Sequence, residues 1–164
     1  MNFRARLAYD HARGEYRDGA LRYLLIRPEA LMALIAELPD RAQALEAFAR
    51  AIHRVGAGSA RAYRDAGAGS ADALLATIEA TAPQLGWGRW AIARTADALA
   101  VTVTNSPFAA ASPGQGAACA PIRGMLCAVG EMVLGAAAIA EETACAADGA
   151  PCCRFAVRRA TPPG

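Results

Sequence analysis

Five cysteines are the side chains of this sequence with the widest choice of chemistry, and all lie in its last third. Three of them occur in "CAADGAPCCRF", residues 145–155, and two in "GAACAPIRGMLCAVGEMVLG", residues 116–135. Their number is odd, and no apolar stretch of signal-peptide length opens the chain. We therefore expect reduced thiols rather than a disulfide framework. Metal binding, a redox pair and buried packing are the alternatives, and a redox pair is disfavoured because no CxxC motif is present.

The spacing of three cysteines and one glutamate is compatible with a metal site. Cys119 falls at the start of an expected helix, Cys145 in the turn region of a final hairpin, and Cys153 on its last strand, with Glu142 three residues before Cys145. Three thiolates and a carboxylate can hold Zn²⁺ tetrahedrally and leave no open position, which is typical of a structural site. Buried cysteines that pack as small hydrophobic residues are the alternative. Spacing alone leaves both open.

The elements expected to position these residues define an α+β protein. The first half is expected to hold a strand over 22–27 and helices over about 28–38, 40–55 and 70–85. "GAGS" at 56–59 is expected to end the second helix, with a short separate helix over 59–66. The side chains expected to face the core from the first two helices are Leu31, Leu34, Ile35, Leu38, Leu45, Phe48, Ile52 and Val55.

The second half changes from helical to strand-rich patterning. A hairpin is expected over 88–107, a helix over 117–137, and a second hairpin over 137–160. This order predicts an antiparallel sheet covered by helices. We expect one domain over 1–164, with a mainly helical part at 1–84, the two hairpins and their helix at 85–158, and a tail at 159–164.

The quoted cysteine segments resemble the V4R domain family, which is named for 4-vinyl reductase and also described as hydrocarbon-binding. The resemblance rests on "CAPIRGMLCAVGEMVLG" and on "EETACAADGAPCCRFAV", which is similar to the family's E-T-x-C-x-A-x-G…C-x-F hairpin. It covers residues 85–158 best. It implies an α+β fold like that of TRAPP-type vesicle-tethering subunits, a homodimer, and a zinc site in the family's aromatic sensors.

The resemblance implies that Cys119, Glu142, Cys145 and Cys153 are ligands of a structural Zn²⁺ that pins the C-terminal hairpin. The intervals of 23, 3 and 8 residues fit the family's pattern. Cys152 departs from it and could compete with Cys153 for the metal. Glu141 is expected to point away from the site, because adjacent side chains of a strand face opposite ways. Cys127 is expected to be a core residue.

A ligand pocket is expected because aromatic residues make up only 6% of the chain, which leaves volume for an apolar guest. Trp87, Trp90 and Phe108 are candidate walls, with ordinary core packing as the alternative. His53 is a candidate polar contact or a hydrogen-bonded core histidine. Arg123 could pair with a ligand carboxylate or balance the charge of −2 that a zinc-bound Cys₃Glu set would carry.

The favoured function is a zinc-containing protein that binds an apolar aromatic, hydrocarbon or tetrapyrrole-like molecule, as a sensor or carrier. The alternatives, implied by the resemblance, are a component of (bacterio)chlorophyll biosynthesis that acts in 4-vinyl reduction, and a structural interaction module. Enzymatic hydride transfer is disfavoured because no dinucleotide-binding glycine fingerprint follows a strand.

Charge and hydropathy limit the expected partners. The net charge is only +2 and no basic run is present, so no nucleic-acid partner is expected. The longest apolar stretch, 124–140, is interrupted by Glu131 and is too short for a membrane span. We expect a cytoplasmic protein.

Overall fold

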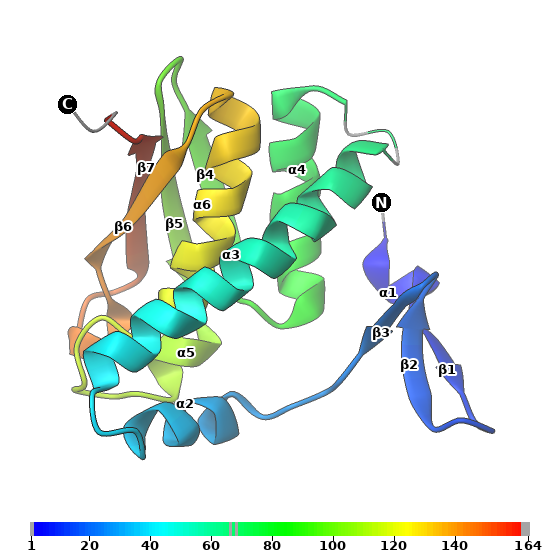
Figure 1. Ribbon diagram of the computed structural model, residues 1–164, viewed down its shortest axis with the longest axis horizontal. Helices are drawn as coiled ribbons and strands as arrows, with labels where there is room; N and C mark the ends of the chain where they lie inside the picture. The colour runs from blue at the N-terminus through cyan, green and yellow to red at the C-terminus, as the bar shows by residue number, and fades with distance from the viewer. Residues whose placement is uncertain (1, 66, 68, 162–164) are drawn as a thin grey trace.

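The expected antiparallel sheet covered by helices is present in the computed structural model, which describes residues 2–65, 67 and 69–161. The sheet has the order β4-β5-β7-β6, and every neighbouring pair is antiparallel. Both expected hairpins are confirmed, and the helix between them lies across one face of the sheet (Figure 1). The bounds are β4 (Arg89–Arg94), β5 (Ala98–Thr104), α6 (Ala120–Leu134), β6 (Ala138–Ala144) and β7 (Cys153–Arg159).

Helix α6 forms the centre of the core. Ile122, Leu126 and Val129 are completely buried and belong to one hydrophobic cluster with Val103 of β5 and Val157 of β7. Burial of such side chains contributes roughly 1.5–3 kcal/mol each. The position of α6 on the sheet is therefore strongly determined, and so is the position of Cys119 at its N-terminus.

Helix α3 (Arg41–Asp65) is one helix of 25 residues, so the expected break at "GAGS" is wrong. It crosses in front of α6 (Figure 1), with which it makes the most extensive contact between any two described elements. A Cβ added to Gly56 would lie 2.8 Å from the Met125 sulfur. Glycine occurs within the helix because side chains of α6 occupy the space beside its backbone, although glycine lowers helix propensity.

The close approach is tightest at Gly124 of α6. A Cβ at this position would lie 2.1 Å from the carbonyl oxygen of Ala49 on α3. The first turn of α3 is capped as expected, with Gln43 N donating to Asp40 Oδ1 at 2.9 Å. These contacts fix which face of α3 meets α6.

Three side chains expected to face the core are exposed instead, and this is a second correction. Leu34 and Val55 are 62% and 66% exposed, and Leu38 is also exposed. In α2 (Pro28–Ala36) the buried residues are Met32 and Ile35, so the inward face is rotated from the expected one. Val55 points outward because its neighbour Gly56 is the residue that meets α6.

Helix α4 packs against α3 and the edge strand β4. Leu74, Leu75 and Ile78 are buried in α4, as its periodicity predicts. No helix in the described part of the chain is long and apolar enough to cross a membrane. The bounds are α1 (Phe3–Arg6), α4 (Ala71–Thr81), the 3₁₀ helix η1 (Ala82–Leu85), α5 (Pro107–Ala110) and the 3₁₀ helix η2 (Ala146–Asp148).

The N-terminal segment forms a second, three-stranded antiparallel sheet, which was not predicted from the sequence. Its strands are β1 (Ala8–Asp10), β2 (Glu15–Asp18) and β3 (Leu21–Tyr23). The strand expected over 22–27 is therefore wrong beyond Tyr23. Residues 24–27 instead form a connection to α2 (Figure 1), along which Leu24 is 80% exposed.

Candidate functional site

The three cysteines and the glutamate that sequence spacing singled out lie together at one end of the four-stranded sheet. One ligand atom from each of Cys119, Glu142, Cys145 and Cys153 falls within 4.8 Å of all the others. Cys119 comes from the N-cap of α6, Glu142 from β6, Cys145 from the start of η2, and Cys153 from the first residue of β7. Residues up to 34 positions apart in the chain thus meet at one point.

The donor set and its spacing fit a tetrahedral ion of the zinc type. The sulfur atoms of Cys119 and Cys153 are 3.5 Å apart. A tetrahedral ion with metal–sulfur bonds of about 2.3 Å places its sulfur ligands about 3.8 Å apart. All three thiols are buried, and all five cysteines of the chain are free. Thiolates favour soft ions such as zinc over magnesium or calcium.

Glu142 provides an independent observation that fits a cation. Its Oε2 accepts a hydrogen bond from the backbone N–H of Cys119 at 3.1 Å, whereas its Oε1 is buried without a hydrogen-bond partner. A buried carboxylate oxygen without a partner is unfavourable unless a cation or water satisfies it. The strand pairing skips one residue between Glu142 and Ala144, so a bulge lies beside the site.

Hydrogen bonds within the cluster shift the pKa values of its thiols in opposite directions. The Cys119 and Cys153 sulfurs share a hydrogen bond, and this bond and burial raise the pKa of Cys119. The same bond and the backbone N–H of Ala146 lower the pKa of Cys153 to about 6. Burial, followed by the adjacent Glu142 carboxylate, raises the pKa of Cys145 to about 12. The four groups cannot all carry negative charge at this separation without a cation between them.

The neighbouring thiols and carboxylate lie outside this group of four. Cys152 is buried but is not among the clustered residues, and Glu141 is exposed while Glu142 faces the cluster. Cys127 lies two turns further along α6 and is half-buried. It packs against the core, as expected, and also borders a cleft.

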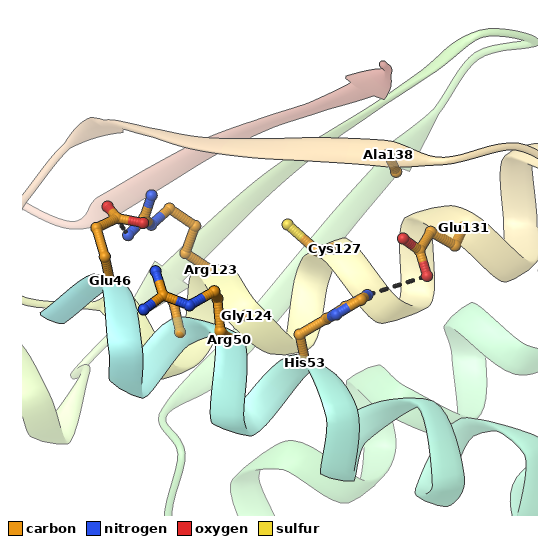
Figure 2. A pocket seen from close by; sticks show the side chains of 9 residues that line it. Glu46, Arg50, His53, Arg123, Gly124, Cys127, Glu131 and Ala138 are labelled. Atoms are coloured by element: carbon orange, nitrogen blue, oxygen red, sulfur yellow. Dashed lines mark hydrogen bonds and ion pairs between the residues drawn. The ribbon is translucent and has the colours of Figure 1, made fainter. Parts of the chain in front are cut away.

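This cleft is a second candidate site, with a volume of about 210 Å³ between α3, α6 and β6 (Figure 2). Two of the predicted ligand contacts, His53 and Arg123, line it. His53 Nε2 lies 3.0 Å from Glu131 Oε2, and Arg123 pairs with Glu46. The full lining is Glu46, Ala49, Arg50, His53, Arg123, Gly124, Cys127, Glu131 and Ala138.

Regular helical spacing brings the cleft and the cysteine cluster onto the same elements. Cys119, Arg123, Cys127 and Glu131 follow one another at intervals of four along α6, so each lies beside the next on the helix surface. In the same way β6 carries Ala138 beside the cleft and Glu142 at the cluster. One helix and one strand therefore connect the two sites.

The three aromatic residues predicted as pocket walls do not line this cleft. Trp90 and Phe108 are buried in the core, and the rings of Trp87 and Phe108 meet edge to face at a centroid distance of 5.4 Å. Trp90 donates its indole N–H to the carbonyl of Trp87 at 3.0 Å. Trp87 is only half-buried, whereas a ligand could reach Trp90 and Phe108 only if the core opened.

Sequence reasoning missed four residues of the cleft that carry chemistry. They are Glu46 and Arg50 on α3, and Cys127 and Glu131 on α6. The available signal was the interval of four residues that joins Cys127 and Glu131 to Arg123, and Glu46 to Arg50.

Comparison with known proteins identifies the fold. No protein-family model matches the chain, and no curated protein matches it. Among solved structures, the phenol-responsive sensory domain of the transcription activator PoxR, determined with phenol, superimposes with a TM-score of 0.82 at 20% sequence identity. The match covers 96% of this chain and 87% of that one. The expected α+β fold, an antiparallel sheet packed by helices, is thereby confirmed.

A second solved structure extends the same architecture. Trafficking protein particle complex subunit 3 from Naegleria fowleri, covalently bound to palmitic acid, matches with a TM-score of 0.57 at 11% identity. The match covers 80% of this chain and 89% of that one. The expected likeness to vesicle-tethering subunits is therefore present at the level of the fold.

Proposed function

We propose that this chain is a small-molecule-sensing domain of the V4R type, and that its ligand binds in the cleft between α3 and α6. The observation that carries the proposal is the likeness of nearly the whole chain to a sensory domain determined with phenol. The cleft supports it, because small-molecule sites are concave and combine apolar walls with a few polar groups.

The second part of the proposal is that Cys119, Glu142, Cys145 and Cys153 hold one Zn²⁺ per chain. The support is the soft donor set, the distance between its sulfurs and the partnerless Glu142 oxygen. Four protein donors leave no position for a substrate, so the ion would act as a structural cross-link. Its role would be to hold η2 and β7 against the N-terminus of α6.

The proposed ion would also set the shape of the cleft. Arg123 lies one turn from Cys119 on α6, and Ala138 lies on the same strand as Glu142. Loss of the ion would free the end of α6 that carries Cys119 and the end of β6 that carries Glu142. We therefore expect ligand affinity to depend on the metal although no metal ligand lines the cleft.

Ligand-observed NMR with phenol on metal-loaded protein tests the small-molecule site. Ala138→Phe would place a ring in the cleft and should abolish saturable binding. Ile139→Phe is the matched control, since Ile139 is exposed and adjacent strand residues face opposite sides. Equal binding by both variants would contradict this location for the site.

The two alternative functions receive less support from the structure. A cleft of about 210 Å³ is of the size that holds one ring rather than a tetrapyrrole, since a cavity of about 150 Å³ holds benzene. A structural interaction module would bind no small molecule. The same NMR experiment distinguishes it, because it predicts no saturable binding at all.

We also propose that the chain forms a homodimer, as the resemblance to V4R domains implies. The support from this chain is the run Leu24, Leu25 and Ile26, which is 50–80% exposed and offers apolar surface outside the core. Leu25→Asp should halve the mass measured by light scattering. A wild-type chain that is monomeric at micromolar concentration would contradict the proposal.

A further inference from the structure

The cleft carries an unequal distribution of charge, and this defines the chemistry of its ligand. We propose that the cleft binds a small carboxylate with an apolar body of about one ring, and that Arg50 and Arg123 hold the carboxylate. The inference rests on the proposed small-molecule site and specifies what that site accepts.

One end of the cleft has an excess of positive charge. Arg123 pairs with Glu46, whereas Arg50 forms no ion pair within the described part of the chain. Glu46 and Arg50 lie one turn apart on α3, and Figure 2 shows Arg50, Glu46 and Arg123 at the same end of the cleft. Two guanidinium groups and one carboxylate leave one positive charge uncompensated. A carboxylate is its natural complement, because it accepts two parallel hydrogen bonds from a guanidinium.

The opposite end disfavours an anion. Glu131 and His53 form a hydrogen-bonded pair at 3.0 Å, so a carboxylate placed there would meet the negative charge of Glu131. Like charges at such distances repel, and a partly closed site screens them less than bulk water does. The two ends together orient a bound carboxylate with its charged group toward Arg50.

The middle of the cleft fits a compact apolar body. Its lining there consists of Ala49, Gly124, Cys127 and Ala138, none of which is larger than a thiol side chain. A cavity of about 150 Å³ binds benzene, so about 210 Å³ accommodates one ring with a carboxylate substituent. Burial raises the pKa of the Cys127 thiol, which keeps this surface uncharged near neutral pH.

Isothermal titration calorimetry of the metal-loaded protein, in buffer of low ionic strength, tests the inference with benzoate, phenol and benzylamine. These probes share one ring and differ in charge. Benzoate should bind at least tenfold more tightly than phenol, and benzylamine more weakly than either. Hydrogen bonds to a charged group change affinity by roughly tenfold to a hundredfold.

Three variants separate the charge effect from general damage. Arg50→Gln should weaken benzoate binding at least tenfold and leave phenol binding unchanged. Arg54→Gln is the matched control, because Arg54 lies one turn further on α3, is exposed and does not line the cleft. Glu46→Gln should strengthen benzoate binding, since it removes a negative charge and releases Arg123. A substitution at Glu46 that only disturbed the helix would weaken benzoate binding instead.

The outcomes distinguish this inference from the proposed function. Phenol binding that equals or exceeds benzoate binding, or an Arg50→Gln variant with wild-type benzoate affinity, overturns the carboxylate inference and leaves the small-molecule site standing. Failure of all three probes to bind at millimolar concentration overturns both. Tight benzoate binding with opposite effects of Arg50→Gln and Glu46→Gln supports both.

Discussion

Removal of one proposed metal ligand should destabilise the chain by about the free energy that metal binding contributes to the folded state. In Cys145→Ser a hydroxyl, which is a poor zinc ligand, replaces one of four donors that lie within 4.8 Å of one another. An ion that binds only the folded state stabilises it by about 2.7 kcal/mol when present at 100 times its dissociation constant. For a chain of this size, that corresponds to a fall in Tm of roughly 5–11 °C.

Thermal unfolding with and without a chelator measures this effect. Chelation should lower the Tm of the wild type by most of the fall estimated above, whereas the Tm of Cys145→Ser should scarcely change. Cys152→Ser is the matched control, because it buries the same hydroxyl next to Cys153 but lies outside the cluster. The reasoning is refuted if Cys145→Ser keeps the metal content and Tm of the wild type. It is also refuted if Cys152→Ser loses as much metal and stability as Cys145→Ser.

Three further predictions concern packing and charge. Gly124→Ala should lower the free energy of unfolding by about 3 kcal/mol or more in urea titrations, because its Cβ would lie 2.1 Å from the Ala49 carbonyl oxygen. Gly58→Ala in α3 is the control: Gly58 has open space around it, so this substitution should raise the free energy of unfolding by roughly 0.5–1 kcal/mol, and a similar loss at both positions would contradict the packing argument. The hydrogen bond from Arg17 and the nearby arginines lower the pKa of Glu15 below its ordinary value of 4.5, so its stabilisation of the N-terminal sheet is complete above that pH and disappears as pH falls through the lower folded-state pKa. The protection factors of the β2 amides, which are exchange rates corrected for the intrinsic rate at each pH, should therefore fall on acidification in the wild type and fall less in Glu15→Gln; an equal fall in both would contradict the prediction. Phe108→Ala should cost about 3–5 kcal/mol of stability, as for a buried core aromatic, while the folded fraction keeps its ligand affinity; a selective loss of affinity would show that the aromatic cluster is a ligand wall after all.

The second half of the chain could be predicted from sequence because its local signals agree with its tertiary structure. The alternating strands on either side of a periodic helix give the hairpin–helix–hairpin order that the structure shows. The intervals between Cys119, Glu142, Cys145 and Cys153 resemble a known pattern, and the structure brings these residues together. Short hairpins and one helix leave few other ways to arrange them.

The first half was predicted less well because long-range contacts override local propensity there. Gly56 lowers helix propensity, yet α3 continues through it, since the surface of α6 requires a residue without a side chain at that point. No such contact is visible in a sequence read element by element. The N-terminal meander, β1 to β3, has strands of only three or four residues, which are too short for a clear alternating pattern.

The cleft could not be predicted because it is made by the crossing of two helices. Whether Arg50 or Cys127 borders an opening depends on how α3 lies over α6, and that depends on the contact between Gly124 and Ala49. The predicted aromatic walls do not line it, because close packing holds Trp90 and Phe108 in the core and leaves Trp87 half-buried against Phe108.

Native mass spectrometry of freshly purified protein tests the central claim most directly, because one spectrum reports oligomer, metal and retained small molecule. The account predicts a dimer with one zinc ion per chain, and an additional organic mass that is lost in Ala138→Phe. A metal-free chain that carries no small molecule and unfolds at the same temperature with or without added zinc would contradict it.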